Sequence, residues 1–332
     1  MPLQYADGVL AEHRVCRRHA VVFDVSHLGS VHVRGPGALE GLQHAFTNDL
    51  GRIAGGRAQY THLLDPDDAH VVDDLIVWWL DDEDFVVMPN ASNTAPLLEA
   101  LRVEVGERVD VGDMTSTRAV LAVQGPDARR ALDTIAHELA GAQRFSVERV
   151  SWRGHDCIVA GTGYTGEDGV EIHVPVAGAA ELWSALLEAG IAPAGLGARD
   201  TLRLEMGYPL HGHELGPGIT PLQARLGWVV RFDKGPFRGR EPLVAERERG
   251  PHRLLRGLTV HGRQVPRAGH VVSLDGEAVG EVTSGNFSPT LGHSIALAFL
   301  PAGVDAGAAV EIDVRGRTLV ATVTDPPFVR PG

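Results

Sequence analysis

Between residues 30 and 206 the hydrophobic positions follow the two-residue period of strands in some segments and the longer period of helices in others. Alternating or continuous apolar runs predict strands over residues 30–34, 59–64, 71–80, 85–88, 119–123, 147–152, 156–160 and 170–174. Helical spacing predicts helices over residues 38–46, 94–101, 180–187 and 199–206, with another from Gly125-Pro126 to about Ile135. The sequence therefore predicts mixed α and β structure in this part of the chain.

From His252 onward the pattern becomes regular, with short apolar runs separated by Gly and Pro turns. These runs cover residues 255–260, 270–274, 278–283, 294–299, 309–314 and 318–323. Such even spacing predicts a small all-β domain shaped like a barrel. A helix over residues 241–249 is expected to lead into it.

Composition narrows the function classes. A net charge of −13 argues against a nucleic-acid binder, which needs a broad positive surface to meet phosphates. No apolar run approaches the roughly 20 residues of a membrane helix, and the first residues lack the apolar stretch of a secretory signal, so we expect a cytoplasmic protein. The two cysteines, Cys16 and Cys157, are expected to be reduced and structural. Lys234 is the only lysine, which disfavours Schiff-base chemistry.

The segment Gly161–Gly166 has the glycine spacing of a dinucleotide-binding loop and follows a predicted strand. That motif needs a helix directly after it, because the helix N-terminus holds the pyrophosphate. Here the chain continues into the alternating strand pattern of residues 170–174. We therefore interpret the segment as a tight glycine loop that either approaches a ligand or only turns, followed by a strand with Glu171 on one face and Ile172 on the other.

Asp73 and Asp74 interrupt an otherwise apolar strand. Strand alternation sends their side chains to opposite faces, so at least one of them should be partly buried. A buried carboxylate is costly without partners, and it therefore either forms local hydrogen bonds or occupies a ligand site. The pattern alone slightly favours the structural role.

Other polar groups allow more than one interpretation. Arg199 and Arg203 have the spacing that puts two side chains on one helix face, where a guanidinium either lies at the surface or binds a carboxylate. The cluster His211-Gly212-His213-Glu214 lacks the helical spacing of a zinc protease, so no metal site is predicted. A local basic stretch is either a solvated face or a dock for an acidic partner: Arg225, Arg231, Lys234, Arg238 and Arg240.

Six segments resemble, in the same order, motifs of the T-protein (aminomethyltransferase) family of the glycine cleavage system. They are Phe23-Asp24-Val25-Ser26-His27, Gln59-Tyr60-Thr61, Asp73-Asp74-Leu75-Ile76-Val77, Gly163-Tyr164-Thr165-Gly166-Glu167-Asp168-Gly169, Gly195-Leu196-Gly197-Ala198-Arg199-Asp200-Thr201-Leu202-Arg203-Leu204-Glu205 and Thr283-Ser284-Gly285-Asn286-Phe287-Ser288-Pro289-Thr290. The resemblance covers almost the whole chain. It implies an α+β fold of three domains in a cloverleaf around a central cleft, with mixed α/β folate-binding domains and a C-terminal antiparallel β-barrel.

The resemblance also implies how the chain divides into domains. Residues 1–52 with 151–240 would form a discontinuous, N-terminally shortened first domain, residues 53–150 the second, and residues 241–332 the barrel. Compared with the family pattern, roughly the first 25 residues of a usual member are expected to be absent. Leu28 stands where the family usually has Met, and Asp67-Asp68-Ala69-His70 replaces a turn that usually contains glycine.

By the same resemblance, the chain would transfer the methylene carbon of the aminomethyl group on lipoyl H-protein to tetrahydrofolate. The products would be 5,10-methylenetetrahydrofolate, ammonia and dihydrolipoyl H-protein. Asp73 would be the catalytic carboxylate, which orients the pterin, assists proton transfer and stabilises developing positive charge. Substrate-binding or cleft positions would be Glu171, Arg199, Tyr60, Asn90 and Tyr164. The basic stretch between Arg225 and Arg240 is the predicted docking surface for H-protein.

Two other functions use the same fold. One is a tetrahydrofolate-dependent demethylase of the same superfamily, although the chain lacks the attached flavin domain of the fused dehydrogenases. The other is a non-catalytic folate-binding protein that supports iron-sulfur assembly. Relatives of that type carry a Lys-Gly-Cys-Tyr signature, where this chain reads Lys234-Gly235-Pro236-Phe237 without a cysteine.

Overall fold

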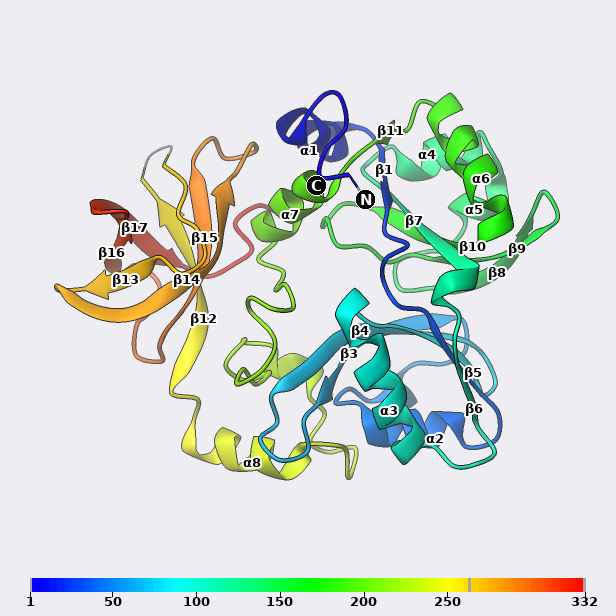
Figure 1. The fold of residues 1–332 in the computed structure, drawn as a ribbon, viewed down its shortest axis with the longest axis horizontal. Coiled ribbons are helices and arrows are strands. Elements are labelled where there is room, and N and C mark those ends of the chain that lie inside the picture. Colours follow the sequence, from blue (N-terminus) through cyan, green and yellow to red (C-terminus); the bar gives the residue numbers. More distant parts are fainter. Residues whose placement is uncertain (1, 262–263, 331–332) are drawn as a thin grey trace.

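A computed structural model describes residues 2–261 and 264–330. Figure 1 shows a β-barrel on one side and two sheets with their covering helices on the other. Helix α7 (Leu196–Glu205) lies between the barrel and the upper sheet. The mixed α and β architecture and the closed barrel confirm the predicted fold class.

The first sheet has six strands in the order β11-β1-β7-β10-β9-β8. They are β1 (Val21–Asp24), β7 (Arg118–Gln124), β8 (Val147–Trp152), β9 (His155–Ala160), β10 (Gly169–Pro175) and β11 (Ala192–Pro193). All neighbours pair antiparallel except β1 with β11. The core on one face includes Leu121, Ile172 and Leu182, the last from helix α6 (Val176–Glu188). Helices α4 (Ala128–Asp133) and α5 (His137–Ala140) contribute to the same core.

The second sheet has five strands in the order β3-β4-β5-β2-β6. They are β2 (Val31–Arg34), β3 (Arg57–Leu64), β4 (Val71–Asp81), β5 (Asp84–Met88) and β6 (Asp110–Asp113). Helices α2 (Ala38–Ala45) and α3 (Thr94–Glu104) pack on one face through Leu42 and Leu97. On the other face, Trp78 shares a buried cluster with Phe23 and Ile158 of the first sheet. The two sheets are therefore joined by an apolar core, in which each fully buried large side chain contributes about 1.5–3 kcal/mol.

The barrel has the closed strand order β12-β15-β14-β13-β16-β17. Its strands are β12 (Arg253–Val260), β13 (Val271–Leu274), β14 (Glu277–Phe287), β15 (Ser294–Pro301), β16 (Ala309–Val314) and β17 (Arg317–Thr324). Leu258, Ala298 and Ile312 lie in its core. The predicted C-terminal barrel is confirmed. Helix α8 (Arg240–Arg249) precedes it but buries Leu243 against residues of the second sheet.

The chain crosses between the two sheets at points that the sequence did not reveal. Strand β2 joins the second sheet, although it lies within the predicted first domain, residues 1–52 with 151–240. Strand β7 joins the first sheet, although it lies within the predicted second domain, residues 53–150. Apolar patterns identify strands but not the partners with which they form hydrogen bonds, so sheet membership could not be read from the sequence. The predicted domain limits stay a prediction.

Helix α7 connects distant parts of the molecule. Its Leu196 donates a backbone hydrogen bond to the carbonyl of Pro2, and the carbonyl of Glu205 accepts from Phe328. Helix α1 (Val9–Arg18) lies beside it and sends Arg17 to the Glu205 carboxylate at 2.9 Å. Within the described residues, no helix is long and apolar enough to cross a membrane.

Candidate active site

Strand β4 carries both carboxylates of the predicted site. Asp73 is fully buried, with 0% of its surface exposed, and lies on the same strand face as Leu75. Asp74 lies on the opposite face, directly across from His62 in the register of β3 and β4. The prediction that the two side chains point to opposite faces and that at least one is buried is confirmed.

Asn90 lies between the two carboxylates. Its backbone N–H donates to Asp73 Oδ2 at 3.1 Å, and its side-chain amide donates to Asp73 Oδ1 at 2.8 Å and to Asp74 Oδ1 at 2.9 Å. Asn93 adds a donor to Asp73 Oδ1 at 2.8 Å, and the hydroxyl of Tyr60 donates to Asp74 Oδ2 at 3.0 Å. The donors that reach this pair are therefore neutral amides and a phenol.

This environment makes the pair easy to protonate. Burial, and then the neighbouring charge of Asp74, raise the pKa of Asp73 to about 7, against the hydrogen bonds from Asn90 and Asn93. Burial also raises the pKa of Asp74, while the hydrogen bond from Tyr60 acts in the opposite direction. Asn90 donates to both carboxylates, and among the described residues no Lys or Arg donates to either, although the charge of His211 acts to lower the pKa of Asp74. Carboxylates with raised pKa values suit acid–base chemistry.

Aromatic rings border Asp74 on one side. The ring of Tyr60 stacks on that of Trp228, with 6.2 Å between centroids and an angle of 28° between the planes. Trp228 is 61% exposed, although large apolar side chains are usually covered. His62 meets the Tyr60 ring edge-on, and its two buried ring nitrogens have no hydrogen-bond partner among the described residues. Burial lowers the pKa of His62 to about 3, so its ring is neutral.

A second group of predicted residues lies on β10 and α7. Glu171 Oε2 accepts a 2.5 Å hydrogen bond from the hydroxyl of Thr162, and the guanidinium carbon of Arg199 lies 4.7 Å from the centre of the Tyr164 ring. Burial lowers the pKa of Arg199, while the charge of Glu171 acts in the opposite direction. The Arg199 Nη1 atom is buried and has no partner among the described residues. A buried guanidinium N–H without an acceptor is a strong candidate to bind a ligand oxygen.

The Tyr164 ring links the two groups. Its hydroxyl donates to the carbonyl of Pro209, and its ring stacks with Tyr208 at 5.8 Å. Burial raises the pKa of Tyr164, and the charges of Arg203, Asp74 and Arg199 also act on it. One aromatic ring therefore lies within the electrostatic reach of Asp74 and against Arg199. The predicted residues Tyr60, Asp73, Asn90, Tyr164, Glu171 and Arg199 form one region, although they come from separate segments of the chain.

The glycine loop before β10 packs closely against neighbouring residues. A Cβ atom on Gly163 would lie 1.9 Å from the side-chain oxygen of Gln124, and one on Gly161 would lie 1.9 Å from the carbonyl of Gln143. The loop therefore needs glycine for close packing. It continues into β10, as predicted, and no helix follows it on which a pyrophosphate could lie.

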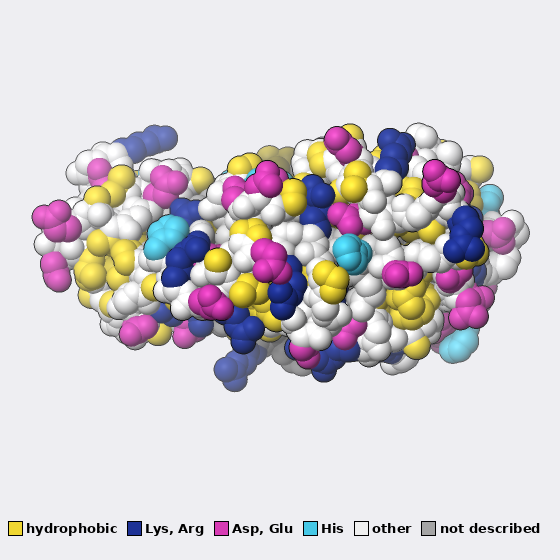
Figure 2. Space-filling view, turned by 90° about the horizontal axis from the view of Figure 1, so that it is seen from below, with side chains coloured by type: hydrophobic (Ala, Val, Ile, Leu, Met, Phe, Trp, Pro, Cys, Tyr) yellow, Lys and Arg dark blue, Asp and Glu magenta, His cyan; other side chains and the backbone are white. Residues whose placement is uncertain are grey.

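The basic stretch is largely engaged in contacts within the chain. The Lys234 ammonium donates to the carbonyls of Gln43, Phe46 and Asn48, next to the C-terminal end of α2. Arg225 pairs with Asp325, Arg238 donates to the Leu64 carbonyl, and Arg240 pairs with Glu241. The Nε atom of Arg231 is buried and has no hydrogen-bond partner among the described residues. Figure 2 shows acidic and basic side chains interspersed on the lower face of the molecule. Docking on this stretch stays a prediction.

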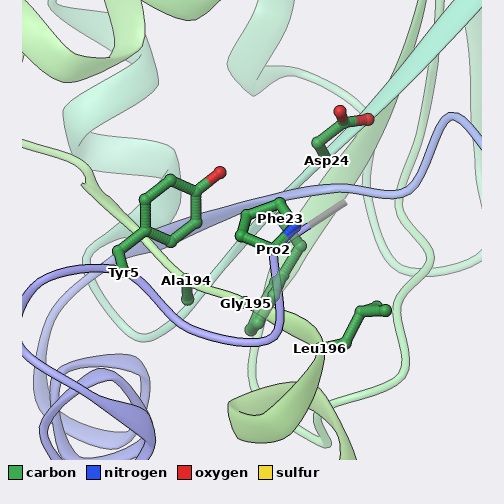
Figure 3. Close-up of a pocket in the computed structure, with 7 residues that line it drawn as sticks. All are labelled: Pro2, Tyr5, Phe23, Asp24, Ala194, Gly195 and Leu196. Atoms are coloured by element: carbon green, nitrogen blue, oxygen red, sulfur yellow. The ribbon is translucent and has the colours of Figure 1, made fainter.

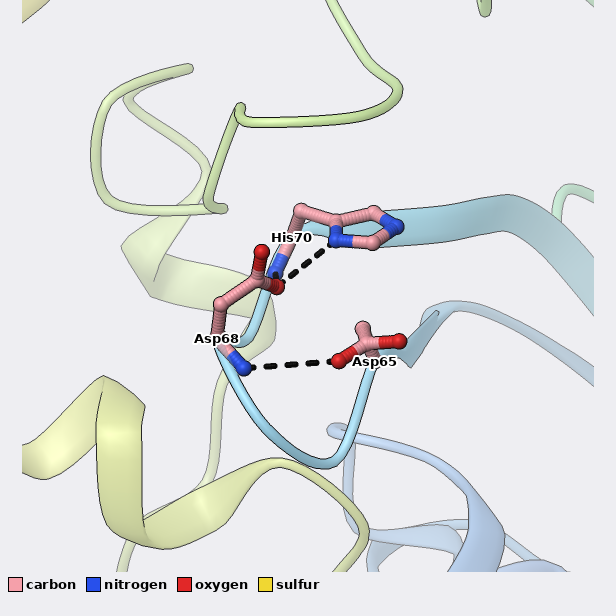
Figure 4. A group of neighbouring side chains, drawn as sticks. All are labelled: Asp65, Asp68 and His70. Atoms are coloured by element: carbon pink, nitrogen blue, oxygen red, sulfur yellow. Dashed lines mark hydrogen bonds and ion pairs between the residues drawn. The ribbon is translucent and has the colours of Figure 1, made fainter.

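Polar loops elsewhere have structural explanations. In the turn between β3 and β4, Asp65 Oδ1 accepts from the backbone N–H of Asp68, and Asp68 Oδ1 accepts from the backbone and ring of His70 (Figure 4). These contacts are those of a polar turn. In the predicted loop cluster, the His211 ring contacts the Val72 carbonyl, and Glu214 pairs with Arg203 at 3.1 Å.

The cavity drawn in Figure 3 lies beside the N-terminal segment. It is lined by Pro2, Tyr5, Phe23, Asp24, Ala194, Gly195 and Leu196. Its volume of about 10 Å³ is close to that of one water molecule, so it is too small for a substrate.

Sequence reasoning missed four residues of the site: Asp74 as a group distinct from Asp73, Asn93, Thr162 and Trp228. Strand alternation already distinguished the faces of the two aspartates, but it did not show which face meets Tyr60. Asn93 and Thr162 lie outside the regular strands and α-helices, so no periodic pattern in the sequence marks them. An isolated Trp in a loop-rich stretch could have marked an exposed aromatic surface.

Comparisons with known proteins agree with this geometry. The family model described as the GCVT N-terminal domain matches residues 1–234, and the glycine cleavage T-protein C-terminal barrel domain matches residues 253–330. An aminomethyltransferase of Frankia alni is 49% identical over 99% of this chain and 91% of its own length. One from Mycobacterium avium is 48% identical over 99% of the chain and 90% of its own length.

A solved structure gives the same result for the fold. The glycine cleavage system aminomethyltransferase T of Bartonella henselae superimposes with a TM-score of 0.94 and 35% identity, covering 100% of this chain and 92% of that one. These names favour neither the demethylase nor the accessory-protein alternative.

Proposed function

We propose that the carbon donor is lipoyl H-protein and that the acceptor is tetrahydrofolate. The chain belongs to the glycine cleavage T-protein family and is an aminomethyltransferase, and the proposal proceeds from this. The methylene carbon leaves the lipoyl sulfur and joins tetrahydrofolate. The products are 5,10-methylenetetrahydrofolate, ammonia and the dihydrolipoyl form of H-protein.

This proposal rests on Arg199 Nη1, which is buried beside Glu171 and the Tyr164 ring and has no hydrogen-bond partner in the part of the chain that the structure describes. A folate offers carbonyl and carboxylate oxygens for a guanidinium and an amino-substituted ring edge for a carboxylate. It also offers flat rings that can stack on Tyr164 or Tyr60. The residues present therefore fit this co-substrate in charge and in hydrogen-bonding character.

We assign different roles to the two aspartates. The sequence predicted Asp73 as the catalytic carboxylate, and that assignment stays a prediction. The face of β4 on which each side chain lies favours Asp74 for contact with substrate, because Asp74 shares its face with Tyr60 and its charge reaches Tyr164. Asp73 is buried on the other face and holds Asn90 and Asn93. It therefore acts as a positioning residue through Asn90.

Tetrahydrofolate supplies the nitrogen atoms that accept the carbon, and the protein supplies electrostatics and proton transfer. An ionised Asp74 stabilises positive charge that develops at the carbon as it leaves sulfur, while Tyr60 fixes the carboxylate by donating to Oδ2. Burial raises the pKa of Asp74, which makes this carboxylate a stronger base than an exposed one. Glu171 and Arg199 orient the co-substrate.

For H-protein, we propose that Trp228 is the contact nearest the site. It is exposed, yet it stacks on Tyr60, whose hydroxyl binds Asp74. Exposed Trp side chains are frequent anchors in protein interfaces. The basic residues around it would add favourable charge at the rim of that interface.

The test compares Asp74→Asn with Asp73→Asn, measuring ammonia release from aminomethyl-loaded H-protein and tetrahydrofolate binding by calorimetry. We expect Asp74→Asn to lose about 100-fold or more in turnover while binding tetrahydrofolate, because the change keeps the shape and removes the charge. Asp73→Asn should lose about 10-fold, because Asn90 is displaced rather than removed.

Asp82→Asn, at the exposed tip between β4 and β5, is the matched control and should keep full turnover. Full turnover in Asp74→Asn together with an inactive Asp73→Asn would return the catalytic role to Asp73. Loss of tetrahydrofolate binding in Arg199→Gln would support the assigned folate site, and unchanged binding would contradict it.

A further inference from the structure

A groove of about 560 Å³ is lined by residues of both sheets, among them residues of β8 and β9. Its lining comes from both sheets: Arg34, Met114, Arg118, Arg149, Val150, Ser151, Asp156, Cys157, Ile158 and His173. A volume of this size is in the range of sites for small organic molecules. The groove contains none of the residues assigned to folate binding.

Strand register explains why charged groups meet in this groove. Arg149 pairs with Ile158, and Ile158 pairs with His173, so these side chains point to one face of the first sheet. Val120 lies opposite His173 on β7, and Arg118 is two residues before it on the same face. This is also the face that packs on the second sheet through Ile158. The apolar core between the sheets therefore ends at this groove, and arginine side chains line the space beyond it.

The Arg118 guanidinium is held in a fixed orientation. Its Nε donates to His173 Nδ1 at 3.1 Å, and its Nη2 donates to the carbonyls of Asp156 and His173 at 3.0 Å each. Since Nδ1 of His173 accepts, Nε2 carries the proton and donates to the Ser30 hydroxyl at 3.0 Å. Burial, and then the charge of Arg118, lower the pKa of His173 to about 3, which keeps the ring neutral. A neutral histidine thus orients the guanidinium.

Three arginines and one carboxylate, that of Asp156, line the groove in an acidic protein of net charge −13. Arg34 and Arg149 both bind Asp84, at 2.9 and 2.5 Å. Asp156 gives its backbone carbonyl to Arg118. Arg34, Arg118 and Arg149 all line the groove, and each of these contacts uses only part of a guanidinium. Among the described residues, each of the three therefore keeps N–H groups without an acceptor.

We infer that this groove binds a small organic anion, with phosphate or carboxylate oxygens held by Arg118 and Arg149 and an apolar body against Met114 and Ile158. Guanidinium forks bind such oxygens in pairs, and a fixed fork loses little freedom on binding. The apolar floor favours an anion with a hydrocarbon part over an inorganic ion. The site is separate from the aminomethyl-transfer site and does not depend on the function proposed for it.

The test is calorimetric titration of the full chain with phenyl phosphate and with isophthalate, in low salt. Inorganic phosphate serves as the probe without an apolar part. We expect binding of at least one organic anion, with inorganic phosphate at least 10-fold weaker. Stronger binding of phenyl phosphate would identify a phosphate ester as the ligand class, and stronger binding of isophthalate a dicarboxylate.

Arg149→Gln and Arg118→Gln should each lower the affinity for the organic anion by 10-fold or more. Arg130→Gln, on the exposed surface of α4, is the matched control and should leave binding unchanged. No heat of binding with any of the three probes would overturn the inference. So would binding that Arg149→Gln leaves intact, or binding that tetrahydrofolate displaces, since the latter would locate the anion in the folate site. If Arg149→Gln lowers thermal stability and the unchanged chain binds no anion, the role of these arginines is to form ion pairs between the sheets.

Discussion

Glu205 and Asp73 are both fully buried carboxylates, yet their pKa values are shifted in opposite directions. Burial alone would raise both. At Glu205, hydrogen bonds from His13 and Ser288 and the charge of Arg17 outweigh burial and lower the pKa to about 2. At Asp73 the nearest groups are neutral amides and a second carboxylate, so burial prevails. The partners, rather than the depth of burial, separate a structural carboxylate from a reactive one.

The two shifts have opposite consequences for stability against pH. Glu205 has a lowered pKa in the folded state, so its contribution to stability is present above its unfolded pKa and disappears only as the pH falls through about 2. Asp73 has a raised pKa, so its contribution is present below its unfolded pKa of about 4 and disappears as the pH rises through about 7. Near neutral pH the Glu205 cluster therefore stabilises the fold, and the aspartate pair costs stability.

The largest effect that follows concerns activity. Because burial raises the pKa of both aspartates, we expect turnover to fall about tenfold per pH unit below a limb that lies above the pKa of an ordinary carboxylate. The measurement is kcat for ammonia release between pH 5 and pH 9, with saturating tetrahydrofolate. A limb near pH 4 would mean that the pair is ionised by a charge absent from the described contacts, and the comparison with Glu205 would fail.

The next effect concerns the structural carboxylate. Glu205→Gln leaves Arg17 without its buried partner, while Ser288 and Thr290 lose the charged acceptor, so we expect a loss of about 3 kcal/mol in the free energy of unfolding. Denaturant unfolding followed by circular dichroism measures it. The loss should be present at pH 8, since Glu205 is ionised there.

Glu241→Gln provides the control, because Glu241 pairs with Arg240 at 2.9 Å with its side chain 83% exposed. Exposed pairs of this kind contribute at most about 1 kcal/mol. The pH limb of turnover should be the same in Glu205→Gln as in the unchanged chain. A shifted limb would show that the two clusters are coupled through α7.

The sequence drew attention to the aspartate pair but not to Glu205, and a catalytic role for the pair stays a prediction. Asp73 and Asp74 were identifiable because carboxylates break an apolar strand pattern, and that break is visible without knowing the fold. Glu205 lies on a helix beside polar neighbours, where a carboxylate is ordinary. Its role depends on Arg17 of α1 and Ser288 of the barrel, which are far away along the chain. Local sequence patterns do not predict contacts between such distant segments.

The fold shows the same division. The barrel strands were predictable because each is short, apolar and bounded by turns, and the barrel closes on itself. The pairing of β1 with β7 and of β2 with β5 and β6 was not, because it depends on which segments meet after long loops. Family resemblance supplied the residues of the site, whereas their grouping around Asn90 and Tyr164 required three-dimensional contacts.

The smallest effect concerns the turn that leads into β4. Ala69 occupies the family's glycine-containing turn with a φ of 61°, a conformation that costs a residue with a Cβ about 1 kcal/mol or more. Ala69→Gly removes that strain but also loses a buried methyl group, at about 0.8 kcal/mol, and makes the unfolded chain more flexible. These terms oppose each other, so we expect a change of less than about 1 kcal/mol in the free energy of unfolding.

Turnover of Ala69→Gly should be unchanged for a separate reason. The backbone N–H of Asp68 donates to the Asp65 carboxylate, and that of His70 donates to the Asp68 carboxylate. These bonds hold the turn, and neither involves the Ala69 methyl group. The strand that carries Asp73 and Asp74 should therefore keep its position. Thermal unfolding together with kcat for ammonia release measures both quantities. A large drop in kcat at unchanged stability would mean that the strained conformation of Ala69 helps to position the two carboxylates. Their neutral hydrogen-bond partners would then be insufficient to hold them in place.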